Sequence, residues 1–238
     1  MSFQRFKLLS FDVMGTLIDY ERGILTYIRQ CAGAAASRLS DRDILEACAR
    51  AEEQRQKAAP HLPFTRLLAP IYDDMALELG LTAGGDAAEG LRNSVADWPA
   101  FPDSVAALRR LGRHFRLVAL TNADNQALDH MARTLGDPFD DRTTAEDVGV
   151  SKPDPQVFAY CRGRQSTAGY GLADWLHVAQ SQYHDIGVAK ALGFTVAWIE
   201  RRKGEEGAGA TPRVSSPTKP DYHFASLAEL ADVVERCV

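Results

Sequence analysis

A carboxylate with the features of a nucleophile lies near the start of the sequence, in Asp12-Val13-Met14-Gly15-Thr16. Gly15 permits a sharp turn after the aspartate, and the hydroxyl of Thr16 can orient its carboxylate. An apolar run over residues 6–11 precedes them and predicts a buried strand that ends at Asp12. Such an aspartate can form an ester intermediate, although the same segment also fits a turn or a helix N-cap.

Three further polar segments contain groups that could assist this nucleophile. Thr121 and Asn122 follow an apolar run and supply a hydroxyl and an amide for binding an oxyanion or a carboxylate. Lys152 precedes a proline that restricts the backbone, and Ser181 and Asp185 lie between an apolar run and a predicted helix. Each has an ordinary alternative, namely a turn, an exposed loop lysine and a carboxylate at a helix N-terminus.

The elements that must position these groups alternate along the chain. We expect buried strands over residues 6–11, 116–120, 175–179 and 194–199, because these runs are apolar without polar alternation. Apolar residues at helical spacing predict helices over residues 103–111, 125–135 and 227–234. This order predicts an α/β fold, a Rossmann-like parallel sheet with helices on both faces. Ligands bind such sheets beyond the carboxyl ends of the strands, where the polar segments should meet.

One long stretch interrupts this alternation. Residues 19–98 contain no expected strand and include helical patterns over 44–57 and 67–79. We therefore predict a discontinuous core domain, residues 1–18 and 99–238, with a helical cap domain, residues 19–98, inserted over the cleft. Residues 201–220 are rich in Gly, Ser, Thr and Pro and are expected to form a long surface loop, which at this length can be a functional loop near the cleft.

Composition limits the classes of partner. The chain has 238 residues, 45% hydrophobic, and a formal net charge of -5. This charge offers little attraction for nucleic acid or an anionic membrane, so we expect a small-molecule substrate. No apolar run approaches the roughly 20 residues of a membrane span, and no signal-peptide pattern opens the sequence, so we expect a cytoplasmic protein. The four cysteines form no C-x-x-C pair and are expected to be reduced.

The four polar segments, taken in this order, resemble the motifs of the haloacid dehalogenase (HAD) superfamily. The resemblance covers nearly the whole chain and implies a HAD core with an inserted helical cap. Two departures bear on the reaction. Where phosphatases of the superfamily carry an acid two residues after the nucleophile, this chain has Met14, and where they carry a magnesium-binding aspartate it has Gln180. An amide is a poor replacement for a carboxylate ligand of magnesium.

A halide leaves carbon without a proton, so these departures resemble the L-2-haloacid dehalogenase branch. The resemblance implies that a small 2-haloalkanoic acid loses halide from C2 through an aspartyl ester, with no metal and no cofactor, and it makes a homodimer plausible. It implies catalytic roles for Asp12, Thr16, Lys152, Ser181 and Asp185. It implies substrate binding by Val13, Met14, Thr121, Asn122, Arg66, Phe158, Gln182 and His184.

The match to this branch is incomplete. Gln182, His184 and Phe158 replace the asparagine, tryptophan and tyrosine of well-described members, and the cap arginine that supports halide departure has no secure counterpart among Arg50, Arg55 and Arg66. Two alternatives therefore remain: a ring-opening hydrolase of L-azetidine-2-carboxylate, from a related branch, and a magnesium-dependent HAD phosphatase. A cap carboxylate such as Glu52 or Glu53 pointing into the cleft would favour the ammonium-bearing azetidine, and an inward arginine would favour a halide.

Overall fold

A parallel β-sheet forms the centre of the computed structural model, which describes residues 3–205, 207 and 209–237. The strand order is β3-β2-β1-β4-β5-β6, and all pairs are parallel. From β1 the sheet extends through β2 to β3 on one side, and through β4 and β5 to β6 on the other. The strands are β1 (Leu8–Phe11), β2 (Arg116–Thr121), β3 (Asp141–Thr144), β4 (Trp175–Ala179), β5 (Thr195–Ile199) and β6 (Tyr222–Phe224).

The four strands expected from apolar runs are the four central strands of this sheet. Their side chains alternate between the two faces, so that Leu8 and Leu9 of β1 belong to different buried clusters. The two edge strands, β3 and β6, were not expected. Both are short, and β3 reads Asp-Arg-Thr-Thr, with only its last two residues buried. The expected α/β class is confirmed.

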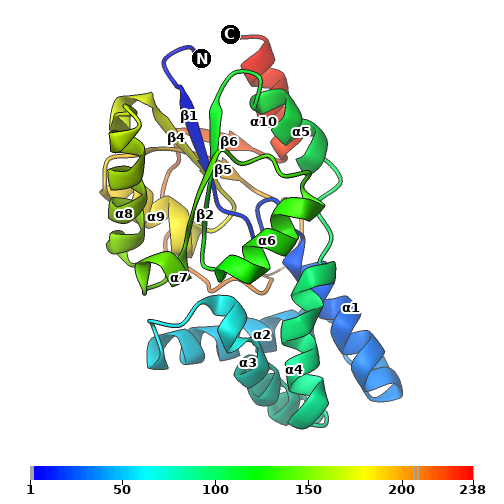
Figure 1. Cartoon of the computed structure of the whole chain (residues 1–238). Coiled ribbons are helices and arrows are strands. Elements are labelled where there is room, and N and C mark those ends of the chain that lie inside the picture. The colour runs from blue at the N-terminus through cyan, green and yellow to red at the C-terminus, as the bar shows by residue number, and fades with distance from the viewer. Residues whose placement is uncertain (1–2, 206, 208, 238) are drawn as a thin grey trace.

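Helices cover both faces of the sheet (Figure 1). On one face lie α5 (Ser104–Leu111), α6 (Asn125–Thr134) and α10 (Leu227–Glu235). On the other lie α7 (Ala145–Val148), α8 (Pro155–Thr167) and α9 (Gly187–Ala191). Short 3₁₀ and π turns complete the core as η3 (Leu172–Asp174) and η4 (Gln182–Ile186). Because β1 and β4 connect in opposite directions across the sheet, their carboxyl ends form the switch point at which such folds bind ligands.

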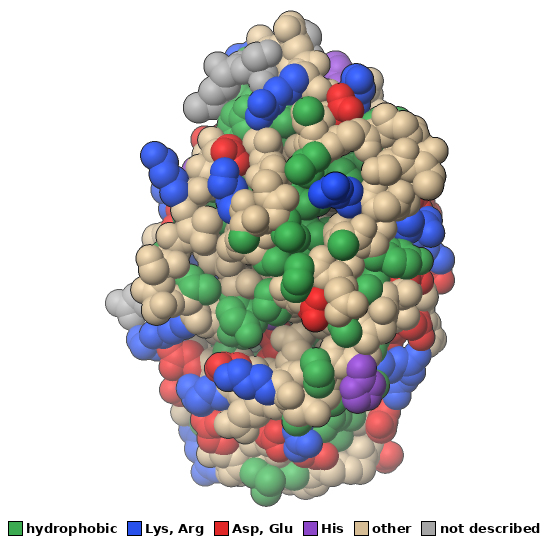
Figure 2. Space-filling model, turned by 90° about the vertical axis from the view of Figure 1, so that its left-hand side faces the viewer, with side chains coloured by type: hydrophobic (Ala, Val, Ile, Leu, Met, Phe, Trp, Pro, Cys, Tyr) green, Lys and Arg blue, Asp and Glu red, His purple; other side chains and the backbone are tan. Residues whose placement is uncertain are grey.

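A second group of helices lies across the carboxyl ends of the strands, at the end of the molecule opposite to both termini (Figure 1). This cap, residues 20–97, contains α1 (Tyr20–Ala32), η1 (Gly33–Arg38), α2 (Asp41–Ala58), α3 (Phe64–Leu79), α4 (Gly85–Asn93) and η2 (Ser94–Asp97). The chain leaves and re-enters the core at one place, because Ile18 and Ala100 form an antiparallel bridge. Figure 2 shows the surface hollowed where the two parts meet.

The amphipathic helix α2 determines which cap side chains face the core. It begins with a capping box in which the Ser40 hydroxyl accepts a hydrogen bond from the amide of Asp43. Its buried residues recur at helical spacing, and this buried stripe includes Glu52 and Gln56 as well as the apolar Cys48. A carboxyl and an amide are therefore placed on the inward face of the cap. Within the part of the chain that the structure describes, no helix is long and apolar enough to cross a membrane.

The segment between β5 and β6, which we call the strap (residues 200–221), contains no helix or strand among its described residues. It crosses the junction between core and cap. The amide of Ala210 donates to Glu21 of α1, and the Thr211 and Tyr20 hydroxyls lie 3.0 Å apart. Arg213 pairs with Glu46 of α2 at 3.0 Å. The strap therefore links the sheet to two cap helices.

Candidate active site

The Asp12 carboxylate is held by a hydrogen bond to each oxygen. It lies directly after β1, buried and only 5% exposed. The Thr16 hydroxyl donates to Oδ2 at 2.6 Å, and the Lys152 ammonium donates to Oδ1 at 2.9 Å. The turn between Asp12 and Thr16 requires Gly15. Its φ of +83° suits glycine, and a Cβ at this position would come within 3.1 Å of Tyr20. The loop therefore presents the carboxylate in one fixed orientation.

Lys152 is fully committed to this arrangement. Its Nζ donates to Asp12 at 2.9 Å, to Asp185 at 2.6 Å and to the carbonyl oxygen of Leu120 at 2.9 Å. These bonds account for the three donors of an ammonium group. The Asn122 side chain holds the Lys152 backbone by accepting from its amide and donating to its carbonyl. Lys152 thus orients the Asp12 carboxylate, and its donors are not free to bind a substrate carboxylate.

A buried chain of hydrogen bonds fixes the orientation of the Asp185 carboxylate. Its Oδ1 is 3.0 Å from Nε2 of His177, and Nδ1 of the same ring is 2.8 Å from the Ser10 hydroxyl, which accepts from the indole of Trp175. His177 therefore contacts an acidic residue of the site. The other oxygen of Asp185, Oδ2, is buried and has no hydrogen-bond partner among the described residues. An acceptor in this state is able to bind a water molecule.

The charges of this cluster shift one another's protonation. Burial raises the pKa of Asp12 above its ordinary value, and the opposing effect of Lys152 does not fully offset it. Burial also acts against the charged form of Asp185, yet Lys152 and His177 hold its pKa below the usual value. Burial likewise disfavours charge on Lys152, but the two carboxylates raise its pKa. Asp12 is therefore the more basic of the two carboxylates.

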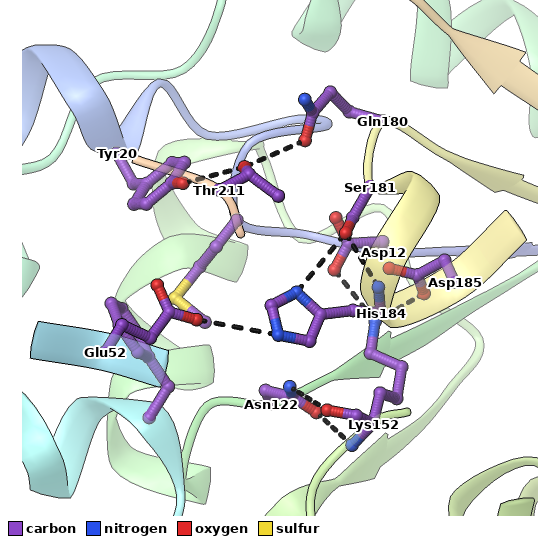
Figure 3. Close-up of a pocket in the computed structure, with 12 residues that line it drawn as sticks. Asp12, Tyr20, Glu52, Asn122, Lys152, Gln180, Ser181, His184, Asp185 and Thr211 are labelled. Atoms are coloured by element: carbon purple, nitrogen blue, oxygen red, sulfur yellow. Dashed lines mark hydrogen bonds and ion pairs between the residues drawn. The ribbon is translucent and has the colours of Figure 1, made fainter. Parts of the chain in front are cut away.

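The cap supplies the opposite wall of a small cavity, of about 30 Å³. The cavity reaches seven residues proposed from the sequence, Asp12, Met14, Asn122, Lys152, Ser181, His184 and Asp185. It is also lined by Tyr20, Glu52, Phe64, Gln180 and Thr211. Figure 3 shows the Glu52 carboxyl directed at the ring of His184, which lies between Glu52 and Ser181. A space of this size accommodates a molecule of only a few heavy atoms.

Three proposed substrate-binding residues lie outside the cavity because the core or cap uses them elsewhere. Phe158 is buried in the core, where its ring packs edge-on against His177 and Phe194. Arg66 pairs with Asp124 at 2.9 Å. The Gln182 side chain accepts from the amide of Thr218 in the strap. Their side-chain directions depend on tertiary packing, which the sequence motifs do not specify.

Three further predicted residues are near the nucleophile without lining the cavity. Val13 is fully buried beside Asp12. The Thr121 hydroxyl accepts from the amide of Ala123, as in an ordinary turn. Thr16 donates to Asp12 and also accepts from the amide of Gln180 at 2.8 Å, so it joins the loops after β1 and β4.

The cap arginines considered for halide binding point away from the cavity. Arg50 pairs with Glu78, and Arg55 forms two hydrogen bonds to Asp74, both on α3. Among the described residues, no arginine lines the cavity, and its only carboxyl from the cap is that of Glu52. Helical periodicity could have placed Glu52 on the inward face of the cap, since Glu52 follows Cys48 by four positions on the buried face of α2.

Tyr20, Phe64 and Thr211 were not identified from the sequence, and no motif marks them. They reach the cavity from α1, α3 and the strap, respectively. Gln180 was noted only as a missing metal ligand, although its place directly after β4 is itself a signal for the cleft. Within the described ranges, no three His, Cys, Asp or Glu side chains are grouped so that they could hold a metal ion.

The family model of the haloacid dehalogenase-like hydrolases matches residues 6–166. The chain belongs to this family. The motifs from Asp12 to Lys152 lie inside the matched region, so the resemblance drawn from the sequence is confirmed. As a member of the haloacid dehalogenase-like hydrolases, the chain is a hydrolase.

Relatives of this haloacid dehalogenase-like hydrolase match over nearly its full length. It is 25% identical to (S)-2-haloacid dehalogenase 1 of Pseudomonas sp. (strain CBS-3), over 95% of each chain, and 25% identical to (S)-2-haloacid dehalogenase of Pseudomonas putida, over 93% of each. Its fold is similar to that of L-2-haloacid dehalogenase from Xanthobacter autotrophicus, with a TM-score of 0.78 and 19% identity over 98% of this chain and 100% of the other. A second structure of that enzyme holds chloropropionic acid covalently bound, and its TM-score is 0.77.

Proposed function

We propose that this hydrolase displaces halide from C2 of a small 2-haloalkanoic acid through an ester on Asp12. The observation that carries the proposal is the Asp12 carboxylate itself, buried in a small cavity with Thr16 and Lys152 each holding one oxygen. The named relatives, which are 2-haloacid dehalogenases over nearly the full length of the chain, support the same reaction.

In the first step an Asp12 oxygen attacks C2 from the side opposite to the halogen, and the carbon–halogen bond breaks with its electron pair. Halide needs no proton, which agrees with the thioether of Met14 beside the nucleophile. In the second step water attacks Cγ of the ester. Whichever Asp12 oxygen carries the ester, the other keeps Thr16 or Lys152 as a donor to stabilise the charge that develops there. The unpartnered Oδ2 of Asp185 is available to orient the water.

The test is chloride release from L-2-chloropropionate by the wild type and by Asp12→Asn. We expect the substitution to lower the rate by at least about 1,000-fold, as loss of a nucleophile does. Asp19→Asn is the matched control, because Asp19 only caps α1 through the amide of Arg22. A single turnover in ¹⁸O-water should place the label in the Asp12 carboxylate. Equal rates in Asp12→Asn and wild type, or label confined to the product, would overturn the proposal.

A second candidate is the opening of L-azetidine-2-carboxylate by the same attack at C2. The specific observation that favours it is Glu52, a cap carboxyl in the cavity where an arginine would favour halide. Ring opening of this substrate without chloride release would replace the dehalogenase proposal. The magnesium-dependent phosphatase alternative has less support, because Met14 and Gln180 occupy the positions of its acid and of one metal ligand. Activity on p-nitrophenyl phosphate that EDTA abolishes would favour it.

A further inference from the structure

Glu52 is a buried acid in the wall of the active-site cavity that faces the nucleophile loop. It is 5% exposed, and its Oε1 lies 3.6 Å from Nε2 of His184. The same ring nitrogen is 3.2 Å from Oε1 of Gln56, and Nδ1 is 3.2 Å from the hydroxyl of Ser181. Figure 3 shows this row of side chains running from α2 of the cap to the loop after β4. The reaction proposed above gives Glu52 no role.

At neutral pH the Glu52 and His184 pair holds one titratable proton, which lies on the Glu52 carboxyl. Burial raises the pKa of Glu52 to about 8 and lowers the pKa of His184 to about 4. The carboxyl is therefore protonated and the imidazole neutral, so their contact is not an ion pair. The other titratable groups facing Glu52 are Tyr20 of α1 and Cys48 of α2, and burial raises the pKa of both well above the ordinary value. Glu52 is thus the group on this wall that can release a proton near neutrality.

Among the described residues, the core wall has no equivalent proton donor. Met14, two residues after the nucleophile, carries a thioether, and the Lys152 ammonium is committed to three acceptors. Asp185 has its pKa held low by Lys152 and His177 despite burial, so it is ionised. Among the residues that the structure describes, only the cap side can supply a proton to a leaving group that must depart with one. Halide does not require such a proton, but a ring oxygen does, whereas a ring nitrogen that is already an ammonium carries its own.

We propose that Glu52 is a leaving-group acid, which extends the site to small carboxylates with a strained ring whose oxygen leaves C2. This inference rests on the proposed function, because it uses the same attack by Asp12. Oxirane-2-carboxylate is the sharpest probe of proton donation. Its ring oxygen carries no charge, so Glu52 cannot act on it merely as a counter-ion.

The bonds and protons of this ring opening balance. An Asp12 oxygen forms a bond to C2, the C2–O bond of the ring breaks, and its electron pair stays on the oxygen, which remains attached to C3. Glu52 gives that oxygen a proton and becomes a carboxylate. Water then attacks Cγ of the Asp12 ester and releases 2,3-dihydroxypropanoate. One hydrogen of the water ends on the new 2-hydroxyl, and the other returns to Glu52.

The experiment compares two reactions of the full-length chain, opening of oxirane-2-carboxylate and chloride release from L-2-chloropropionate. We expect Glu52→Gln to lower kcat for ring opening by about 100-fold or more, the usual effect of losing a general acid, and to change chloride release by less than about threefold. Glu52→Asp should restore part of the ring opening. Glu53→Gln is the matched control, because the half-exposed Glu53 pairs with Lys57 and should leave both reactions unchanged.

The pH profile gives a second readout. In the wild type, kcat for ring opening should fall as the pH rises through about 8, where Glu52 loses its proton, and this fall should be absent in Glu52→Gln. Equal losses of both reactions in Glu52→Gln, or undiminished ring opening, would overturn the inference. Chloride release with ¹⁸O in Asp12 but no ring opening by the wild type would refute this inference and keep the proposed function. No turnover of either substrate and no label in Asp12 would refute both.

Discussion

The core wall of the active-site cavity holds three charges in contact with one another, whereas the polar groups of the cap wall are neutral. On the core side, Lys152 lies between the carboxylates of Asp12 and Asp185, and each distance is below 3 Å. Opposite them, Glu52 of the cap and His184 of the loop after β4 are 3.6 Å apart, and both lose their charge through burial. The core therefore orients the Asp12 carboxylate, and the cap holds a proton on Glu52. Three substitutions test this difference.

The largest effect is expected from Lys152→Met, which removes the positive charge between two buried carboxylates. Leaving such charges unpaired costs about 3–5 kcal/mol of unfolding free energy. Urea unfolding at pH 7 should show this loss, and chloride release should fall at least about 100-fold because Asp12 is no longer oriented. Lys190→Met is the control, since the partly exposed Lys190–Asp221 pair should contribute at most about 1 kcal/mol. Equal losses in the two variants would mean that the core cluster has no special electrostatic importance.

The next effect concerns stability against pH on the cap side. The pKa of Glu52 is about 8 in the folded chain and 4.5 ordinarily, so between these values the unfolded state has lost a proton that the folded state keeps. The Glu52 contribution therefore lowers stability by roughly 1.4 kcal/mol per pH unit as the pH rises from 4.5 to 8, whereas the lowered pKa of His184 acts in the opposite direction below pH 6.5. Glu52→Gln lacks this loss. Urea unfolding at pH 5, 6.5 and 8 should show that the unfolding free energy of the variant, relative to that of the wild type, rises at each step. The same dependence on pH in both proteins would contradict a buried, protonated Glu52.

A smaller effect is expected from Thr16→Val, which keeps the shape of the side chain and removes its hydroxyl. The hydroxyl donates to Asp12 Oδ2 at 2.6 Å and accepts from the amide of Gln180. We expect kcat for chloride release to fall about 10-fold, with less change in KM, since one hydrogen bond to a charged group contributes about 1.5–3 kcal/mol. Thr121→Val is the control, because that hydroxyl does not contact Asp12. The same fall in both variants would show that Thr16 has no special role in orientation.

The core wall could be predicted from the sequence much better than the cap wall. Asp12 and Asn122 come directly after buried strands, and Ser181 follows β4 by two residues. Parallel strands bring their carboxyl ends together whatever the details of packing. The cap side chains depend on how helices rest on the sheet. Arg66, which the resemblance made a candidate for substrate binding, pairs instead with Asp124.

The missed edge strands have a related cause. β3 has one neighbour in the sheet and carries Asp141 and Arg142 on a short polar stretch, so it lacks the apolar run that marked β1. The helical periodicity of the sequence still contained information that the sequence motifs lacked. It places Glu52 on the buried stripe of α2, and a buried carboxyl facing a cleft is a signal for chemistry.

The bridge between Ile18 and Ala100 bears on how such a protein can change over evolution or in the laboratory. The two ends of the cap meet there, and the amide of Asp19 donates to the carbonyl of Pro99. The first and last residues of the inserted chain are therefore joined by a backbone hydrogen bond. A different helical unit with the same closely spaced ends can be grafted at this point without altering the register of the sheet. The cap wall of the cavity thus lies on an inserted segment that is joined to the core at one place, whereas Asp12 belongs to the sheet itself.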